Sequence, residues 1–121
     1  MKMVHVTIQT SRFEEEIDFY LKHASLKVRR DMRPVGKDLV FLGDSEASTM
    51  VEIIRNEKAE ESGNAHLSVG FCPEDLDASR AELVSAGLDP TPFITPVPGV
   101  RFFYVKDPAG VNVQFIEASY L

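Results

Sequence analysis

Cysteine is scarce in this chain of 121 residues, which contains only Cys72. A single cysteine cannot close an internal disulfide, and it cannot supply a zinc site made of several cysteines. The fold must therefore be stabilised by an ordinary hydrophobic core, which the 44% hydrophobic content allows. One unpaired cysteine also fits a reducing compartment, so we expect a cytoplasmic protein.

Long hydrophobic runs and an excess of basic residues are lacking as well. No apolar stretch approaches the ~20 residues that a membrane-spanning helix needs, and the first residues lack the pattern of a signal peptide. The chain has 13 Lys and Arg against 19 Asp and Glu, which gives a formal net charge of −6. The lack of a long apolar run argues against a membrane as a partner. Because nucleic-acid binding needs a basic surface, we do not expect a nucleic acid as a partner either.

What the chain does contain is a layout that occurs twice. Residues 99–117, GVRFFYVKDPAGVNVQFIE, hold two apolar runs around a segment with Pro and Gly, which is typical of a β-hairpin. Residues 38–55 repeat this hairpin around a loop that contains Asp. A strand with a histidine, a helical pattern and another strand precede each hairpin. The sequence therefore predicts the α+β class, with two tandem β-α-β-β-β modules.

The boundary between the modules follows from one polar stretch. Residues 56–64, NEKAEESGN, are charged, contain Gly and lack apolar periodicity, as an exposed linker does. We place module 1 at about 1–56, the linker at about 57–64 and module 2 at about 65–121. Together they form a single domain over residues 1–121.

The two helices have recognisable start and stop signals. Ser11 and Glu14 have the spacing of a capping box at the start of the first helix, and the acidic residues 14–16 are expected to be solvated. Pro73 suits the first position of the second helix, and Gly87 suits its end. Further strands are predicted over residues 26–33, 66–71 and 92–95.

Four polar residues occupy matching places in the two modules. His5 and His66 lie on the first strand of each module, and Glu52 and Gln114 lie on the last strand. The spacings are nearly equal, since 52 − 5 = 47 and 114 − 66 = 48. The neighbouring apolar residues must point towards the helices, so all four polar side chains face the other way. Glu117 has the opposite parity and fits this group poorly.

These four side chains offer two imidazoles, one carboxylate and one amide oxygen. Such donors suit a divalent transition metal, namely Zn²⁺, Ni²⁺, Co²⁺, Mn²⁺ or Fe²⁺, which would polarise a substrate oxygen. The alternative is that each histidine is an ordinary hydrogen-bonded strand residue. Two matched pairs within apolar strands favour the metal site. A buried polar group without a partner costs about 1–3 kcal/mol, and a bound metal would be the partner of these side chains.

The one basic cluster of the sequence consists of Arg29, Arg30 and Arg33. One interpretation is a solvated strand edge, where charges discourage pairing with another sheet. The other is the rim of a pocket that attracts an anionic substrate. Both interpretations stay open on the sequence alone.

The paired modules resemble the vicinal oxygen chelate superfamily. The resemblance rests on a His on each first strand, Glu or Gln on each last strand, and two passages. FEEEIDFYLKHASLKV is similar to the superfamily's passage from helix 1 to strand 2, and RFFYVKDPAGVNVQFIE is similar to its closing hairpin. The superfamily includes glyoxalase I, methylmalonyl-CoA epimerase, fosfomycin-resistance thiol transferases, extradiol dioxygenases and bleomycin-binding proteins. The resemblance covers the whole chain and implies concave sheets that form a shared site, often across a homodimer.

Bacterial glyoxalase I is the closest match within this group; it isomerises the hemithioacetal of methylglyoxal and glutathione. The resemblance implies a small-molecule substrate, which could be a thiol adduct. It also implies that the metal ligands are His5, Glu52, His66 and Gln114, with Glu52 as the candidate catalytic base or a metal-bound hydroxide in its place. Gln114 replaces the glutamate that shuttles the proton in glyoxalase I, and an amide can bind a metal but cannot carry a proton.

Three further residues are candidates for substrate binding. Gln9 stands where glyoxalase I has an arginine for the glutathione carboxylate, and Asn56 matches its glutathione-contacting asparagine. Asn56 could equally be the first residue of the linker. Aromatic residues 102–104 must alternate between the two faces of their strand, so at least one of them lines the concavity, with Tyr104 as the candidate.

Three functions are compatible with these features. The first is a glyoxalase-I-like, metal-dependent lyase or isomerase whose substrate chelates the metal through vicinal oxygens. The second is a binding protein without catalysis, for example one that sequesters an antibiotic. The third is a thiol transferase or a dioxygenase that uses two histidines and one carboxylate to hold iron.

Overall fold

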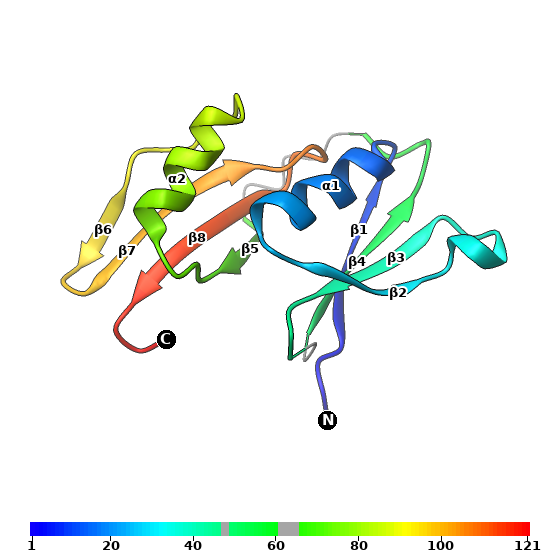
Figure 1. The fold of residues 1–121 in the computed structure, drawn as a ribbon, viewed down its shortest axis with the longest axis horizontal. Coiled ribbons are helices and arrows are strands. Elements are labelled where there is room, and N and C mark those ends of the chain that lie inside the picture. Colours follow the sequence, from blue (N-terminus) through cyan, green and yellow to red (C-terminus); the bar gives the residue numbers. More distant parts are fainter. Residues whose placement is uncertain (47–48, 61–65) are drawn as a thin grey trace. The chain divides into compact units, whose positions relative to one another are not determined.

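The computed structural model describes residues 1–46, 49–60 and 66–121, and the chain divides into two compact units, Met1–Ser62 and Gly63–Leu121. Within these described residues, each unit has one α-helix and four strands, and Figure 1 shows their arrangement within each unit. The first unit contains β1 (His5–Thr10), α1 (Phe13–His23), β2 (Lys27–Asp31), a 3-10 turn η1 (Arg33–Val35), β3 (Leu39–Gly43) and β4 (Met50–Arg55). The second contains β5 (Ser68–Phe71), α2 (Leu76–Ser85), β6 (Ile94–Val97), β7 (Val100–Lys106) and β8 (Asn112–Ala118).

The two sheets have the same topology. Their strand orders are β1-β4-β3-β2 and β5-β8-β7-β6, and in each the first strand pairs parallel to the last while the other pairs are antiparallel. The predicted α+β class with two β-α-β-β-β modules is confirmed. Of the predicted linker, residues 61–64 lie outside the described residues.

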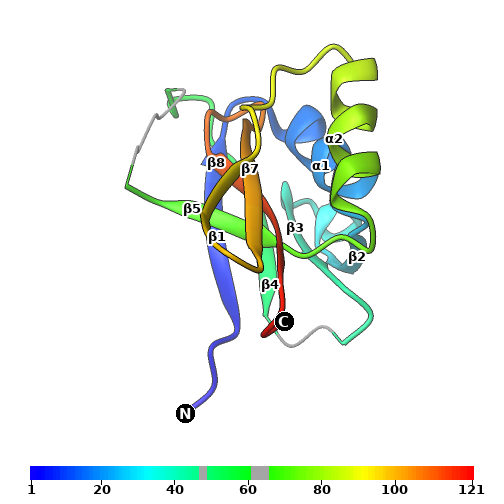
Figure 2. The same ribbon diagram turned by 90° about the vertical axis from the view of Figure 1, so that its left-hand side faces the viewer.

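One face of each sheet packs against the helix of its own unit. In the first unit, α1 contacts β3 and β4, and the core includes Ile8, Phe13, Ile17, Tyr20, Val40, Leu42, Val51 and Ile53. In the second, α2 lies on one side of the sheet and contacts β8 (Figure 2). Its core includes Leu76, Leu83, Phe103, Val113 and Phe115. The opposite face, which carries no helix of its own unit, is called the helix-free face below.

The start of α1 differs from the prediction. Its N-cap is Arg12, which makes no side-chain cap bond, so the capping box from Ser11 to Glu14 is wrong. The preceding strand supplies the contact instead, since the Arg12 backbone N–H donates to Thr10 Oγ1 at 3.0 Å. Glu16 is buried, because it lies one turn before the buried Tyr20 on the stripe that faces the sheet.

The second helix also begins later than expected. Asp75 is its N-cap and accepts a hydrogen bond from the Ala78 backbone N–H at 2.9 Å, so Pro73 precedes the helix. The predicted stop at Gly87 is confirmed. Its φ of +84° is the left-handed conformation that glycine adopts most easily, and its N–H reaches back to the Val84 carbonyl.

Strand boundaries differ from the prediction at three places. β2 ends at Asp31, because the Asp31 carboxylate accepts the Arg33 backbone N–H at 3.0 Å and starts the 3-10 turn. β5 begins at Ser68, which leaves His66 in a turn before the strand. β6 includes Pro96 as an edge strand, where a missing N–H is tolerated. Within the described ranges, no helix is long and apolar enough to span a membrane.

Candidate functional site

A polar cluster lies on the helix-free face of the first sheet. Strand register places Thr7 of β1 and Phe41 of β3 on either side of Glu52 in the central strand β4. Thr7 Oγ1 donates a hydrogen bond to Glu52 Oε1 at 2.6 Å, and His5 Nε2 lies 3.6 Å from the same oxygen. Glu52 is only 9% exposed, so this carboxylate is held away from bulk water by its neighbours.

Two members of this cluster were missed from the sequence. Thr7 has the same strand parity as His5, and this parity was the available signal for it. Phe41 forms an edge-on contact with the His5 ring, with centroids 5.5 Å apart. It could not be placed beside Glu52 without knowing the register between β3 and β4.

The donors of this cluster fit half of a metal site. A tetrahedral ion with bonds of about 2.1 Å holds its ligand atoms about 3.4 Å apart, close to the distance between His5 Nε2 and Glu52 Oε1. The hydroxyl of Thr7 orients the carboxylate, as a polar neighbour of a metal ligand commonly does. Among the described residues, no group of three or more His, Cys, Asp or Glu side chains converges on one point.

Gln9 and Asn56 extend the polar surface at the far end of β1 and β4. Asn56 Nδ2 donates to Gln9 Oε1 at 2.8 Å, and Asn56 Oδ1 accepts the Lys58 backbone N–H at 3.0 Å. The backbone of Asn56 also pairs with Thr10. The structure therefore brings together two of the predicted substrate-binding residues, both within the first unit.

The helix-free face of the second sheet carries Gln114 and Tyr104. These two residues are opposite each other in the β7–β8 pair, and Gln114 Nε2 lies 3.5 Å from the Tyr104 hydroxyl. The Phe102 ring packs edge-on against Tyr104, with centroids 5.6 Å apart. Phe103, between them in sequence, is fully buried on the helix side, as the alternation predicts. Glu117 also lies on that side, paired with Arg101 at 2.8 Å.

His66 does not hold the place in the second unit that His5 holds in the first. Thr7 is opposite Glu52, and Gly70 is opposite Gln114. His5 lies two residues before Thr7, so its counterpart by register is Ser68, two residues before Gly70. His66 lies two residues further out, exposed, in the turn before β5. His5 and His66 therefore have nearly equal spacings along the chain but different positions relative to their sheets.

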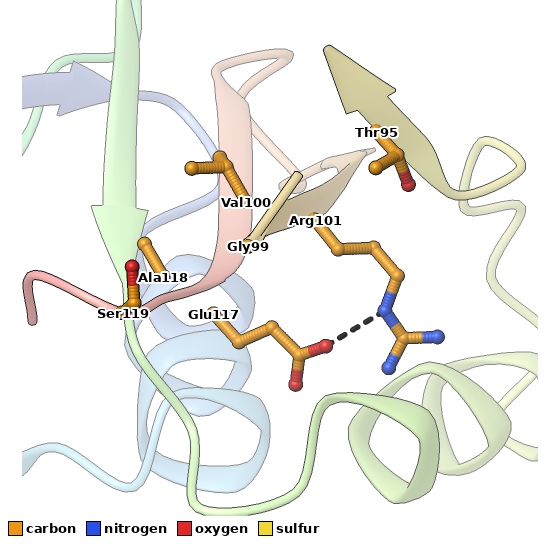
Figure 3. A pocket seen from close by; sticks show the side chains of 7 residues that line it. All are labelled: Thr95, Gly99, Val100, Arg101, Glu117, Ala118 and Ser119. Carbon is orange, nitrogen blue, oxygen red and sulfur yellow. Dashed lines mark hydrogen bonds and ion pairs between the residues drawn. The ribbon is translucent and has the colours of Figure 1, made fainter. Parts of the chain in front are cut away.

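A separate open pocket lies in the second unit, between the ends of β6, β7 and β8 (Figure 3). Its lining residues are Thr95, Gly99, Val100, Arg101, Glu117, Ala118 and Ser119. The Arg101 guanidinium is held by Glu117 and by Asp77 of α2, and it stacks on the Phe93 ring at 4.4 Å. Because the Arg101 guanidinium is already paired with two carboxylates of the protein, we assign no ligand to this pocket.

Solved structures with the same fold include a glyoxalase family protein, an antibiotic-binding protein and a lactoylglutathione lyase. A glyoxalase family protein from Enterococcus faecalis has a TM-score of 0.74 and 20% identity, covering 96% of this chain and 97% of its own. TnmS3, an antibiotic-binding protein from a Streptomyces species, has a TM-score of 0.77 and 19% identity, covering 98% and 97%. A lactoylglutathione lyase from Agrobacterium tumefaciens has a TM-score of 0.70 and 16% identity, covering 95% and 92%. At these identities the likeness shows the fold alone.

Comparison of the sequence itself gives the family. No curated protein sequence matches this chain. A family model does match, over residues 2–115, which include every element from β1 to the middle of β8. The matched residues extend over both compact units. The chain belongs to the Glyoxalase/Bleomycin resistance protein/Dioxygenase superfamily.

Proposed function

We propose that this protein is a glyoxalase-I-like metalloenzyme acting on a small molecule with two vicinal oxygens. His5 and Glu52 hold a divalent transition metal, and His66 and Gln114 are the further ligands. The observation that carries the proposal is the cluster of Thr7, His5 and Glu52, in which a hydrogen-bonded carboxylate and an imidazole lie 3.6 Å apart on the helix-free face.

The residues of the cluster have separate tasks in this proposal. A bound divalent metal supplies Lewis acidity, which polarises a substrate oxygen and makes a neighbouring C–H more acidic. Glu52 accepts the proton from that carbon, because a carboxylate is the group in the cluster suited to act as a base. Thr7 keeps the carboxylate oriented through its bond to Oε1. The Phe41 ring contacts the His5 ring edge-on and limits the rotation of the imidazole.

The substrate class follows from the same chemistry. A hemithioacetal of methylglyoxal presents vicinal oxygens and an acidic C–H, so it suits both the metal and Glu52. Gln114 cannot take or return a proton, so we assign the 1,2-proton shift to Glu52. A homodimer, by analogy with the superfamily, and a cytoplasmic location, from the single cysteine, complete the proposal.

The second candidate function is a binding protein without catalysis. Two features favour it: Gln114 stands where glyoxalase I, which the chain resembles, has a glutamate, and Ser68 has the register position that His5 holds in the first sheet. Both substitutions reduce the metal-binding capacity of the second unit. The helix-free face, with Phe102 and Tyr104, would then hold a ligand by packing and hydrogen bonds.

Metal content of the freshly purified, untagged protein tests the proposal, measured together with its mass in solution. We expect a stoichiometric transition metal in the wild type, loss of that metal in His5→Ala and His66→Ala, and an intact fold by circular dichroism. His23→Ala is the matched control, because His23 is at the end of α1 and contacts Phe19. A protein that refuses added Ni²⁺, Zn²⁺, Co²⁺, Mn²⁺ and Fe²⁺ would overturn the enzyme proposal in favour of the binding protein.

A further inference from the structure

Four side chains form one continuous row across the first sheet. Thr7 is opposite Glu52, Glu52 is opposite Phe41, and Phe41 is opposite Arg30 of the edge strand β2. Residues directly opposite each other in a sheet present their side chains on the same face. Arg30 therefore projects from the helix-free face, two strands away from Glu52, with the Phe41 ring between them.

An irregularity in β2 creates this arrangement. Val28 is opposite the buried Leu42, and the register shifts between Val28 and Arg30. Without that shift, Arg29 would be opposite Phe41, and Arg30 would point towards the helix side of the sheet. β-bulges re-aim side chains in this way and are frequent beside functional sites.

The Arg30 guanidinium has no polar partner among the described residues. In the part of the chain that the structure describes, it makes no hydrogen bond or ion pair, and β2 is exposed along its whole length. The arginines outside β2 are all engaged by carboxylates or backbone carbonyls; these are Arg12, Arg33, Arg55, Arg80 and Arg101. A guanidinium that is free, fixed to a sheet and on the face of the proposed site can bind a further anion.

We propose that Arg30 binds an anionic group at the far end of the substrate, a carboxylate or a phosphate. This inference rests on the proposed function. The vicinal oxygens lie at His5 and Glu52, the middle of the molecule packs on Phe41, and the anion reaches Arg30. Two strand spacings separate Glu52 from Arg30, roughly 10 Å. The substrate is therefore a molecule with a chelating end, an apolar or aromatic middle and a negative end.

Two probes that differ only at the far end test this inference. Mandelate has vicinal oxygens and a phenyl ring, and 4-carboxymandelate adds a carboxylate across the ring. Their dissociation constants are measured by calorimetry on the Ni²⁺-loaded full chain, for the wild type, Arg30→Gln and Lys22→Gln. Lys22→Gln is the charge-matched control, because Lys22 lies on α1, which covers the other face of the sheet, and pairs with Asp18.

We expect the wild type and Lys22→Gln to bind 4-carboxymandelate about tenfold more tightly than mandelate, as one charge-assisted hydrogen-bonded contact allows. In Arg30→Gln the preference falls to about one, while mandelate affinity is unchanged. The inference is overturned if the wild type and Arg30→Gln prefer 4-carboxymandelate to the same degree, or if the wild type does not prefer it to mandelate. Arg30 would then serve only as a charge that discourages the edge strand β2 from pairing with another sheet. Failure of mandelate to bind the metal-loaded wild type overturns the proposed chelating site, and the inference with it.

Discussion

The Thr7 hydroxyl donates a hydrogen bond of 2.6 Å to Glu52 Oε1 across the parallel pair of β1 and β4. A carboxylate that is 9% exposed has few water molecules to orient it, so Thr7 determines how it is presented. Thr7→Val keeps the shape of the side chain and removes the donor. If Glu52 is a metal ligand, we expect metal affinity to fall by about 10- to 100-fold, as for other neighbours of metal ligands.

The measurement for Thr7 is competition for Ni²⁺ against a chromogenic chelator. Thr7→Ser, which retains the hydroxyl, is the control and should keep most of the wild-type affinity. Wild-type affinity in a folded Thr7→Val protein would mean that the hydrogen bond serves the sheet and not a metal.

Gln114 provides a prediction about the reaction. Replacing it with Glu restores a second carboxylate on the helix-free face of the second sheet, beside the Tyr104 hydroxyl at 3.5 Å. A positioned general base contributes about 10²- to 10⁴-fold, so we expect Gln114→Glu to raise kcat for a hemithioacetal by at least about tenfold. Metal occupancy is measured in the same samples. Unchanged turnover at equal occupancy would show that Gln114 does not limit the reaction.

Alternation predicted the faces of the strands correctly. Val51 and Ile53 flank Glu52 in sequence, and both are buried towards α1 while the carboxylate turns to the other side. The same rule predicted that at least one of the aromatic residues 102–104 lines the helix-free face; Tyr104 does so, and Phe103 is buried on the other side. This information is local, because successive side chains of a strand point to opposite faces whatever the strand pairs with.

Register between strands was not predictable from the sequence. The equal spacings of His5 to Glu52 and His66 to Gln114 suggested equivalent positions, yet Ser68 is the register counterpart of His5. The contacts of Glu52 with Thr7 and Phe41 likewise depend on pairing between distant segments. Loop lengths and bulges set that pairing, and the shift beside Arg30 shows that one extra residue changes which side chain faces the site.

Asp107 is expected to be essential for the stability of the closing hairpin. It is 4% exposed, and its Oδ1 accepts the backbone N–H groups of Ala109 at 3.0 Å and Val111 at 2.8 Å. Asp107→Ala leaves one buried and one partly buried backbone donor without this acceptor, so we expect the free energy of unfolding to fall by about 2–4 kcal/mol. Urea denaturation measures the loss. Asp107→Asn keeps an acceptor oxygen and should lose less; equal losses in both variants would contradict this account.

Asp77 and Arg101 predict how acid affects the second unit. The hydrogen-bonded Arg101 guanidinium lowers the pKa of the Asp77 carboxyl below its ordinary value of 3.8. A lowered pKa in the folded state means that the pair stabilises the protein above about pH 4, and that this contribution is lost as the pH falls through the folded pKa. Asp77→Asn should therefore lower the thermal midpoint at pH 7 and have a diminishing effect as the pH falls below 4.

The control is Asp89→Asn. Asp89 is an exposed residue in the loop after α2, so its replacement should shift the thermal midpoint little at any pH. Because surface ion pairs are screened, 1 M NaCl should reduce the Asp77 effect at pH 7. An Asp77→Asn shift that is the same at pH 7 and pH 3 would show that the ionised carboxylate of Asp77 is not what stabilises the second unit.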